Sequence, residues 1–449
     1  MSDGSPRAPK SDHLGPILTT GSLWEDLSDA GTQFPSLSGD SKSNLVVVGG
    51  GFLGLSTGLH AARQGLSVTI LEAAEPGFGA SGRNTGFVVP SLKSSIGPAE
   101  AIHDLGEVHG RRLMRLVARS GADVFDLIRD EGISCHPEQR GWLQPGHSAA
   151  AERILLSRLP ALRDAGVDAD FLDQDAMVAE TGLPEVHGGL KVSSGGQINP
   201  LAYARGLADA AARAGVTLHS RSPALRIEAA GSRWRVETPT GSVIADRIIL
   251  ATNAMAPRDL APGLKASLVP ARVFQIATQV LPYELRAAIL PSGAPMADTR
   301  RHTFALRWSP DGRLMTGGMA APVPGRMEVA KRSFLHRLER WVPGLPPLKA
   351  DYAWTGMIAG TLDFLPRMIK LAPNLYGAIG CNGRGVALTT ALGREIAALC
   401  AGDQDEASFV LPVTPPRAIP LSRLSGIGPH LWLPWSNLVD AFETRHSRT

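Results

Sequence analysis

A glycine turn between two apolar runs at residues 44–71 constrains the fold more than any other part of this 449-residue sequence. Residues 44–48, NLVVV, form a short run of the kind found in buried strands, and GGGFLG follows directly. Apolar side chains then recur at helical spacing as far as Gly65, and residues 67–71 read as a further strand. The stretch therefore predicts a strand, a glycine turn, a helix and a second strand.

The glycines of this turn have the G-x-G-x-x-G spacing of a dinucleotide-binding unit. Gly49 permits the tight turn, Gly51 lets the backbone approach a pyrophosphate, and Gly54 lets the helix pack closely on the strand. Glu72, at the tip of the second strand, can accept hydrogen bonds from an adenosine ribose and would repel the 2′-phosphate of NADP. The flanking residues of this candidate site are Phe52, Leu53 and Ala73. A turn that serves packing alone is the alternative.

A second loop of small residues, GASGRNTGF at residues 79–87, favours FAD over NAD. A flavin bound in extended form needs such a loop, because backbone amides must turn toward its pyrophosphate and ring. We expect Ser81 and Arg83 to contact phosphate oxygens, and Asn84 and Thr85 to reach the ring edge. The other candidate positions of the loop are Gly79, Ala80 and Gly86. The alternative is a surface turn with a solvated arginine.

Two later stretches also point toward a bound cofactor. Residues 243–254, VIADRIILATNA, predict a buried strand that ends in small and amide residues able to pass close to a cofactor. Residues 379–388, IGCNGRGVAL, form a glycine turn before a helix, whose positive end points at whatever lies beyond the turn. The candidate cofactor contacts in these two stretches are Ala251, Thr252, Asn253, Gly380, Asn382, Gly383, Gly385 and Val386. Ala224, which precedes the first stretch, is a further candidate.

Together these stretches resemble a known family, the FAD-dependent amine and amino-acid oxidoreductases of the D-amino-acid oxidase type. Within that family the branch of γ-glutamylputrescine oxidase is the most similar, over about residues 24–440. The segments that carry the resemblance are GGGFLGLS, GASGRNTGF, GGQINPLAYARGLADAAARAG, IILATNA, and TGMIAGTLDFLPR followed by GCNGRGVAL. The resemblance implies FAD as the cofactor and an amine or amino acid as the substrate.

The implied fold class is α/β plus α+β, with a Rossmann-type FAD-binding domain interleaved with an antiparallel-sheet substrate domain. An N-terminal arm comes first, and we expect Trp24 and Phe34 to anchor it. The expected boundaries are 1–43 for the arm, 44–95, 190–265 and 350–415 for the FAD-binding domain, 96–189 and 266–349 for the substrate domain, and 416–449 for a C-terminal extension.

The chemistry implied by the resemblance moves a hydride from the amine-bearing carbon to flavin N5 and leaves an imine that water hydrolyses. Because the neutral amine is the reactive form, no strong general base is required. The helix that follows residues 379–384 would then stabilise the negative charge of the reduced flavin. Arg384 stands where relatives often have histidine, and if it faces the ring it should raise the flavin potential relative to Arg384→Ala. The alternative is an Arg384 turned to solvent.

Four further residues are candidates for the reaction or for contact with the substrate. An arginine can hold a carboxylate in bidentate fashion, and an aromatic wall can hold an aliphatic or cationic amine. We therefore assign catalytic roles to Arg307 and Trp354, and substrate contacts to Trp308 and Gln275. The alternatives are a surface arginine and tryptophans of the core. Cys381 is a thiol whose pKa the adjacent helix start could lower, with a covalent flavin link as the rarer outcome.

Composition limits the remaining function classes. Lys and Arg total 45 against 42 Asp and Glu, and the net charge of +3 implies no commitment to nucleic acid or to a membrane. Three scattered cysteines are too few for a disulfide framework or a zinc site, and the polar N-terminal segment lacks a signal-peptide pattern. We expect a cytoplasmic enzyme that holds no metal and acts on a small molecule. The sequence does not indicate how many subunits it has.

Several alternatives to an amine or amino-acid oxidoreductase remain at this point. One is a dehydrogenase for a D-amino acid or an N-methyl amine that uses an acceptor other than oxygen. Another, from a different class, is a flavin-bearing RNA-modification factor, which would need a basic patch. The last is a protein that binds FAD without catalysis.

Overall fold

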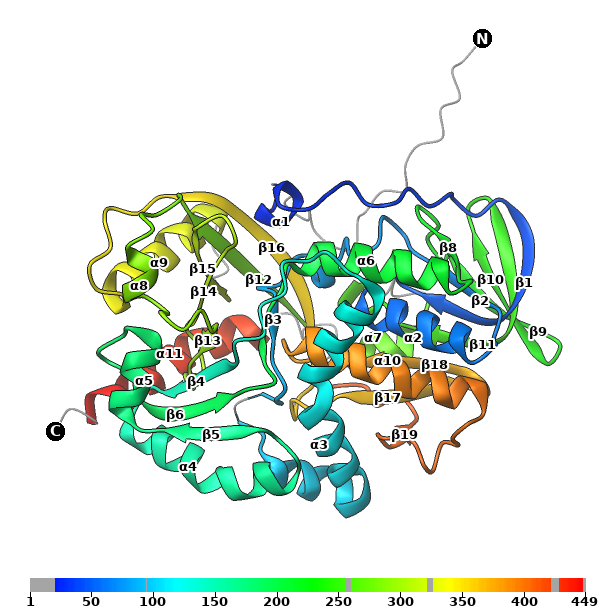
Figure 1. The fold of residues 1–449 in the computed structure, drawn as a ribbon. Helices are drawn as coiled ribbons and strands as arrows, with labels where there is room; N and C mark the ends of the chain where they lie inside the picture. Colours follow the sequence, from blue (N-terminus) through cyan, green and yellow to red (C-terminus); the bar gives the residue numbers. More distant parts are fainter. Residues whose placement is uncertain (1–20, 94, 256–259, 321–325, 421–427, 447–449) are drawn as a thin grey trace, which may run out of the picture.

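The computed structural model describes residues 21–93, 95–255, 260–320, 326–420 and 428–446. Two β-sheets lie side by side, and helices pack on their outer faces (Figure 1). The chain passes back and forth between the two sheets, so each sheet is assembled from segments that are distant in sequence. This confirms the predicted fold class, an α/β domain interleaved with an antiparallel-sheet domain.

The first sheet is centred on β1 (Gly39–Val48), which pairs in parallel with β11 (Gly241–Leu250) and with β2 (Val68–Leu71). Helix α2 (Phe52–Arg63) connects β1 to β2, so the predicted strand, turn, helix and strand are confirmed. The strand order is β19, β17, β18, β11, β1, β2, β8, and β10 and β9 extend from β11. The other strands are β8 (Thr217–His219), β9 (Arg226–Ala230), β10 (Arg233–Thr238), β17 (Arg367–Ala372), β18 (Leu375–Ile379) and β19 (Val413–Thr414).

Apolar layers cover both faces of this first sheet. On one face lie α2, α3 (Pro98–Glu131), α6 (Pro200–Arg213) and α10 (Gly385–Ala401) (Figure 1). Side chains of β1 alternate between the faces, so Leu45 and Val47 join the helical core. Val46 and Val48 point the other way and join a core with β10 and α7 (Pro262–Ala266). All four are buried, as expected for a strand that is covered on both sides.

The second sheet has the order β16, β12, β15, β14, β13, β4, β6, β5, and its pairs are antiparallel except β13 with β4. Its strands are β4 (Trp142–Gly146), β5 (Ala169–Leu172), β6 (His187–Val192), β12 (Val269–Thr278), β13 (Met296–Ala297), β14 (Ala305–Trp308), β15 (Leu314–Gly318) and β16 (Ala350–Gly360). The helices around it are α4 (Ala149–Asp164), α5 (Gln174–Thr181), α8 (Leu285–Ala288) and α9 (Arg326–Trp341).

Three strands depart from the expected domain boundaries. Strand β16 pairs with β12 over most of its length and so belongs to the antiparallel sheet, although it was expected in the FAD-binding domain. Strand β6 crosses the expected boundary at residue 190 and pairs with β4 and β5. Strand β1 begins at Gly39, inside the expected arm. Hydrogen bonds between distant strands decide these positions, and local sequence does not contain that information.

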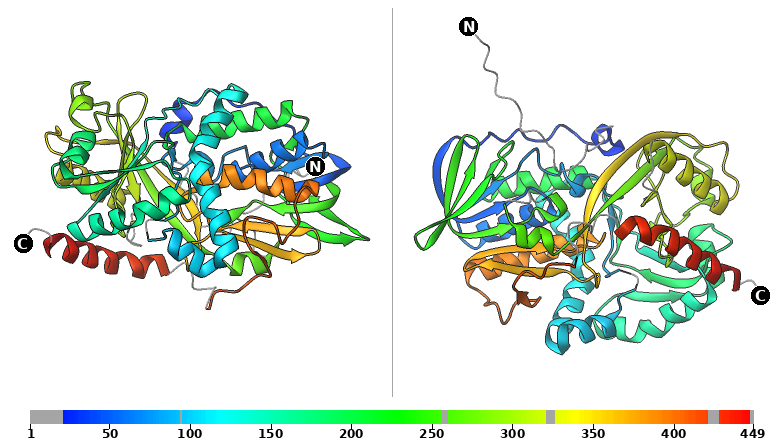
Figure 2. Two further views of the ribbon diagram at one scale, coloured as in Figure 1. Left: turned by 60° about the horizontal axis from the view of Figure 1, so that its bottom comes forward. Right: turned by 180° about the vertical axis from the view of Figure 1, so that it is seen from behind.

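The two ends of the described chain pack onto the body. Helix α1 (Leu23–Asp26) buries Trp24, and Phe34 is buried as well, so the expected anchors of the arm are confirmed. Helix α11 (Gly428–His446) lies across the second sheet (Figure 2, right). The short elements not yet named are η1 (Ala80–Gly82), η2 (Asn253–Met255), β3 (Phe87–Val88) and β7 (Gly196–Gln197). Residues 1–20 of the expected arm, and 421–427 and 447–449 of the expected extension, lie outside the described residues.

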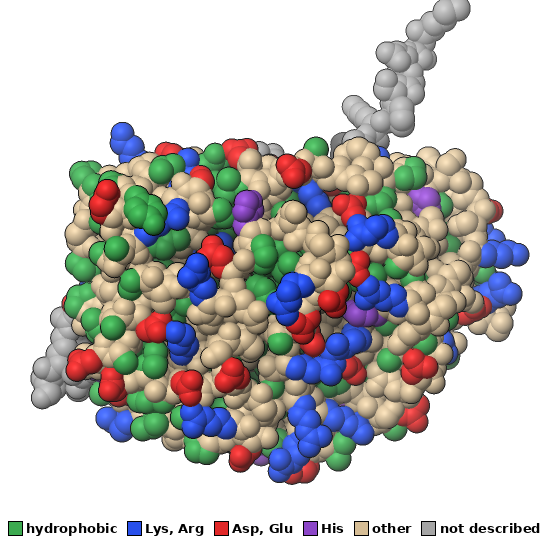
Figure 3. All heavy atoms as spheres, viewed as in Figure 1, with side chains coloured by type: hydrophobic (Ala, Val, Ile, Leu, Met, Phe, Trp, Pro, Cys, Tyr) green, Lys and Arg blue, Asp and Glu red, His purple; other side chains and the backbone are tan. Residues whose placement is uncertain are grey.

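Two further observations concern the surface and the helices. Among the described residues, no helix combines the length and the apolar character that crossing a membrane requires. On the face drawn in Figure 3, basic and acidic side chains are interspersed.

Candidate active site

A cavity of about 930 Å³ lies between the two sheets. Its walls come from the turn before α2, the loop after β2, the turn before α10, and strands β12 to β16 of the second sheet. Fifteen of the predicted site residues line it: Gly51, Phe52, Leu53, Ala80, Ser81, Asn84, Thr85, Ala251, Asn253, Gln275, Asn382, Gly383, Arg384, Gly385 and Val386. Segments far apart in sequence therefore converge on one site.

The turn before α2 is shaped by glycines at which an added Cβ would meet backbone atoms. Gly49 has φ +115°, and a Cβ there would lie 2.9 Å from the carbonyl oxygen of Ala251. A Cβ at Gly54 would lie only 2.0 Å from the carbonyl oxygen of Gly49. The N-cap residue of α2 is Gly51, which has no side chain to accept a capping hydrogen bond, and Phe52 N donates instead to Ser81 Oγ at 3.1 Å. The helix thus presents its amino terminus to the cavity, which suits an anion.

Glu72, directly after β2, links the turn before α2 to the end of β2. Its carboxylate accepts hydrogen bonds from Gly50 N at 2.6 Å and from Ala74 N at 2.8 Å. Burial raises the pKa of Glu72, and the two hydrogen bonds act in the opposite direction. The carboxylate does not line the cavity, so the contact between Glu72 and a ribose stays a prediction.

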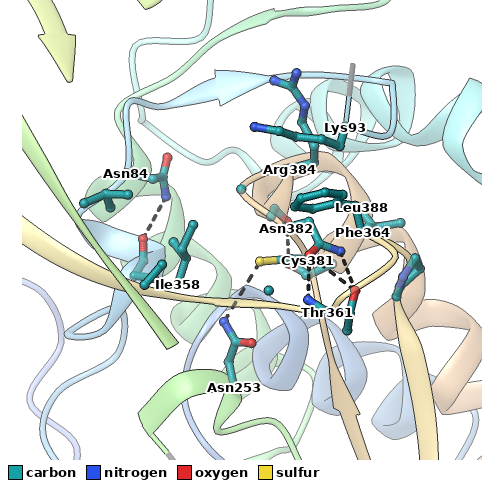
Figure 4. Close-up of a pocket in the computed structure, with 18 of the residues that line it drawn as sticks. Asn84, Lys93, Asn253, Ile358, Thr361, Phe364, Cys381, Asn382, Arg384 and Leu388 are labelled. Carbon is teal, nitrogen blue, oxygen red and sulfur yellow. Dashed lines mark hydrogen bonds between the residues drawn. The ribbon is translucent and has the colours of Figure 1, made fainter. Parts of the chain in front are cut away.

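The loop after β2 is held together by Asn84. Its amide nitrogen donates to Ala80 O and Ser81 O at 3.0 and 2.7 Å, and its oxygen accepts from Gly86 N at 2.7 Å. Asn84 and Ser81 also face the cavity (Figure 4 shows Asn84). Arg83 is a correction, because its side chain turns away from the cavity. It donates to Phe78 O and lies 3.6 Å from the carboxylate of Glu25.

Arg307 and Trp354, predicted to act in catalysis, lie behind this loop, and both predictions are corrected. Arg307 donates to Thr85 O and Ile198 O, each at 2.8 Å, and is fully buried. Trp354 donates to Arg83 O at 3.0 Å and is also fully buried. Ala305 and Ile358, on the same strands, do line the cavity. One part of β14 and of β16 therefore lines the cavity, and another part lies beneath the loop after β2. The loop covers the side chains of Arg307 and Trp354.

Trp308 is a further correction among the substrate contacts. Its indole N–H donates to Ile289 O at 2.7 Å, and the ring joins the core of the second sheet. It sits beside Arg307 on β14 and so points to the opposite face of the sheet. Gln275 does line the cavity, and its Oε1 has no hydrogen-bond partner among the described residues.

Ten predicted cofactor residues do not line the cavity. They are Gly49, Gly54, Glu72, Ala73, Gly79, Arg83, Gly86, Ala224, Thr252 and Gly380. Several of them shape the walls instead. Gly86, for example, has φ +75°, and a Cβ there would lie 2.5 Å from Nη1 of Arg307. Ala224 belongs to the core on the far face of the first sheet.

Helix α10 is the second helix whose amino terminus opens onto the cavity, and a turn at residues 380–384 precedes it. Asn382, with φ +51°, donates to Gly380 O at 2.6 Å and accepts from Thr361 N at 2.9 Å, which ties the turn to the end of β16 (Figure 4). No side chain caps α10, whose first residues Gly385 and Val386 line the cavity. Burial raises the pKa of the Cys381 thiol, which is opposite to the expected fall.

Two cationic side chains stand side by side next to this second helix start (Figure 4). The guanidinium of Arg384 lies over the ring of Trp142 on β4, 5.2 Å from its centroid, so Arg384 is not turned to solvent. Lys93, from the loop after β3, lies beside it. Burial lowers the pKa of Arg384 to about 10. Burial, and then the charge of Arg384, lower the pKa of Lys93 to about 8.

Sequence reasoning missed Lys93 and, apart from Gln275, the residues of β12 and β16 that line the cavity. The only signal for Lys93 is its position, as a single lysine shortly after the apolar run FVV. Besides Gln275, the cavity residues of β12 are Val269, Ala271 and Val273, small or apolar side chains that resemble any core strand. Trp432 of α11 also reaches the cavity, and nothing near it in sequence indicates this.

Comparison with known proteins agrees with this geometry. A family model described as FAD dependent oxidoreductase matches residues 44–399. This chain belongs to the FAD-dependent oxidoreductase family. The flavoenzyme is 30% identical to the probable oxidoreductase OrdL of Haemophilus influenzae over 398 residues, 86% of this chain and 90% of that protein. The predicted resemblance to this family is thereby confirmed.

Two further relatives extend the comparison. The flavoenzyme is 29% identical to the gamma-glutamylputrescine oxidoreductase of Escherichia coli over 386 residues, 86% of this chain and 90% of that protein. It shares its fold with glycine oxidase from Geobacillus kaustophilus, with a TM-score of 0.68 and 20% identity over 84% of this chain and 100% of that one. The start of α2, with a glycine as its N-cap, and the glycine positions that a Cβ would block fit the FAD that this family binds.

Proposed function

We propose that this flavoenzyme oxidises an amine or an amino acid. The observation that carries the proposal is one cavity, between the two sheets, onto which both α2 and α10 open their amino termini. Its size suits a flavin together with a small substrate. Among relatives, the Escherichia coli protein is named for γ-glutamylputrescine and the Geobacillus protein for glycine, and both of those molecules carry amines.

Each helix start has its own task in this proposal. The start of α2 at Gly51 would hold the pyrophosphate of FAD, with Ser81 beside it, and Glu72 would accept hydrogen bonds from the ribose. Asn84 and Thr85 would contact the edge of the ring. The start of α10 at Gly385 would face the ring and stabilise the negative charge that reduction leaves there.

The bound cofactor supplies the two-electron acceptor for a hydride from the amine-bearing carbon. The chain's own residues orient the substrate and keep water away, and apolar side chains of the second sheet make up much of that wall. Among the described residues that line the cavity there is no Asp or Glu. This supports a substrate that reacts as the neutral amine, because such a substrate needs no carboxylate base.

The proposal includes a cytoplasmic location and a small-molecule partner. Cys135, Cys381 and Cys400 are free thiols, which a reducing compartment would preserve.

An anaerobic screen of amines and amino acids tests the proposed function. The purified FAD-loaded enzyme is mixed with each compound, and loss of the flavin absorbance is followed before air is admitted. We expect rapid bleaching by at least one compound. If bleaching occurs but air does not restore the colour, the enzyme is a dehydrogenase with another acceptor. If no amine or amino acid bleaches the flavin, the proposed function is wrong.

A further inference from the structure

We propose that the substrate carries a carboxylate and that Lys93 and Arg384 bind this group together at the start of α10. The inference rests on the proposed function and deepens it, because it selects carboxylated amines over simple amines. It adds Lys93, which no sequence pattern identified, to the residues of the site.

The first observation is an imbalance of charge in the cavity. Four charged or titratable basic residues line it, namely Lys93, Arg301, His302 and Arg384, and within the described residues no acidic side chain does. Arg301 is already neutralised, because its guanidinium contacts Asp440 and Glu443 of α11 at 3.2 and 2.9 Å. Burial lowers the pKa of His302 to about 4, so this imidazole is neutral near pH 7. The uncompensated positive charge is therefore at Lys93 and Arg384.

The second observation is that neither cation of this pair has an acidic partner in the part of the chain that the structure describes. No ion pair to either side chain occurs among the described residues. Nε of Arg384 is buried and has no hydrogen-bond partner in the same set of residues. A buried donor without a partner costs free energy, and two adjacent buried cations also repel each other. An anion placed between them would satisfy the donors and remove the repulsion.

The third observation concerns the shape and position of the pair. The ring of Trp142 supports the guanidinium of Arg384 from one side, which restricts its orientation. Figure 4 places Lys93 and Arg384 on one side of the turn at Cys381, with Asn253 of η2 on the other side. The start of α2, with Ser81, provides a separate place for the pyrophosphate of FAD. A planar guanidinium and an adjacent ammonium suit a carboxylate, which offers two oxygens and a single charge.

The consequence is selectivity for one class of amine. A carboxylated amine would bind with its anion between Lys93 and Arg384 and its apolar part against the second sheet. A simple amine would leave both cations unpaired and, while protonated, would add a third positive charge to the same cavity. Charge-assisted hydrogen bonds of this kind change affinity by about 10- to 100-fold.

The binding test uses the FAD-loaded enzyme and two small probes of nearly equal shape, propionate and propionamide. Binding is followed through the change in flavin absorbance. We expect propionate to bind the unaltered enzyme at least about 10-fold more tightly than propionamide. Lys93→Met should remove this preference, Lys93→Arg should restore most of it, and Lys42→Met, which changes an exposed lysine on β1, should leave it unchanged.

The substrate test compares amines with and without the carboxylate, using alanine against ethylamine and 4-aminobutyrate against propylamine. We expect bleaching to be at least about 10-fold faster for the carboxylated member of one pair, and Lys93→Met to abolish that advantage. If simple amines bleach the flavin equally well, the inference is wrong while the proposed function stands. If propionate binds but Lys93→Met and Lys93→Arg both leave its affinity unchanged, the assignment to Lys93 is wrong. If nothing bleaches, the proposed function falls, and the binding test still decides the inference.

Discussion

Helices α2 and α10 begin in the same way and yet are surrounded by opposite charges. Both follow a glycine-containing turn, in both the N-cap residue makes no capping hydrogen bond with its own side chain, and both open onto the cavity between the sheets. Beside α2 stand the carboxylate of Glu72 and the hydroxyl of Ser81. Beside α10 stand Arg384 and Lys93. The backbone therefore provides the same anion-binding feature, a helix amino terminus, at two places. The neighbouring side chains decide which group binds at each one.

The physical reason lies in how little a helix start specifies by itself. Its free N–H groups and dipole attract any anion, with a strength of about 0.3–1 kcal/mol near the surface and more when buried. At α2, an acceptor such as Glu72 adds the ability to bind sugar hydroxyls near the phosphates. At α10, two cations add a strong preference for a second anion.

Gly54→Ala should have the largest effect, because the new methyl group would lie 2.0 Å from the carbonyl oxygen of Gly49. The turn before α2 would have to move, and we expect FAD to bind about 100-fold more weakly or to be lost on purification. The matched control is Gly58→Ala on the same helix, where the nearest atom to the methyl group is the flexible end of the Ile70 side chain, at 2.7 Å, and no backbone atom is among the nearest contacts. Titration of FAD into apoprotein measures both. Equal affinities for the two variants would contradict the role of the turn.

Arg307→Met should destabilise the loop after β2 without a direct effect on substrate binding. The change leaves Thr85 O and Ile198 O without their donor, for an expected loss of about 2–4 kcal/mol in the free energy of unfolding. The control is Arg332→Met, an exposed arginine on α9. Denaturant unfolding and steady-state kinetics of the FAD-loaded enzyme provide the measurements. A higher KM with unchanged stability would return Arg307 to the substrate site.

Glu72→Gln should weaken the α2 half of the site by a smaller amount. The amide keeps one acceptor oxygen for the N–H groups of Gly50 and Ala74 but places an NH₂ group against the other. We expect FAD to bind about 10-fold more weakly. The affinity for propionate should not change, since α10 is unaltered. If apoprotein stability falls while the affinity for FAD stays the same, Glu72 braces the turn and does not contact the ribose.

The smallest effect is a pH dependence at α10. Burial, and then Arg384, lower the pKa of Lys93 to about 8, so the ammonium loses its proton as the pH rises through that value. Arg384, with a pKa of about 10, stays charged over the same range, and the thiol pKa of Cys381 is raised. Affinity for propionate should fall by about 3- to 10-fold between pH 7 and 9.5, because one of two cations is lost. Since bound propionate raises the pKa of Lys93, the midpoint in the complex should lie above 8.

Lys93→Met should give a flat propionate profile over this range. Propionate is the right probe because it has no amine, and so its own charge is constant above pH 7. A profile that remains steep in Lys93→Met would assign the titration to another group.

Prediction from sequence succeeded where neighbouring residues carry the constraint. The glycine spacing and the apolar runs beside it were enough to predict β1, α2 and β2, and Ser81 and Asn84 line the cavity as expected. It failed for Arg307 and Trp354, whose residue types suited a substrate site. Their strands carry them beneath the loop after β2, and only the paired strands of the second sheet determine how far that loop extends over them.

The amino-acid sequence alone was enough to identify a dinucleotide turn, a second small-residue loop and a helix start near residue 384. Backbone conformation at those places depends on the residues themselves, above all on glycine. Folding alone places Lys93 beside Arg384, in a cavity whose described walls hold no Asp or Glu. That arrangement joins two distant segments across the boundary of two sheets, and the charge that a cavity retains depends on every side chain that folding brings to its walls or keeps away.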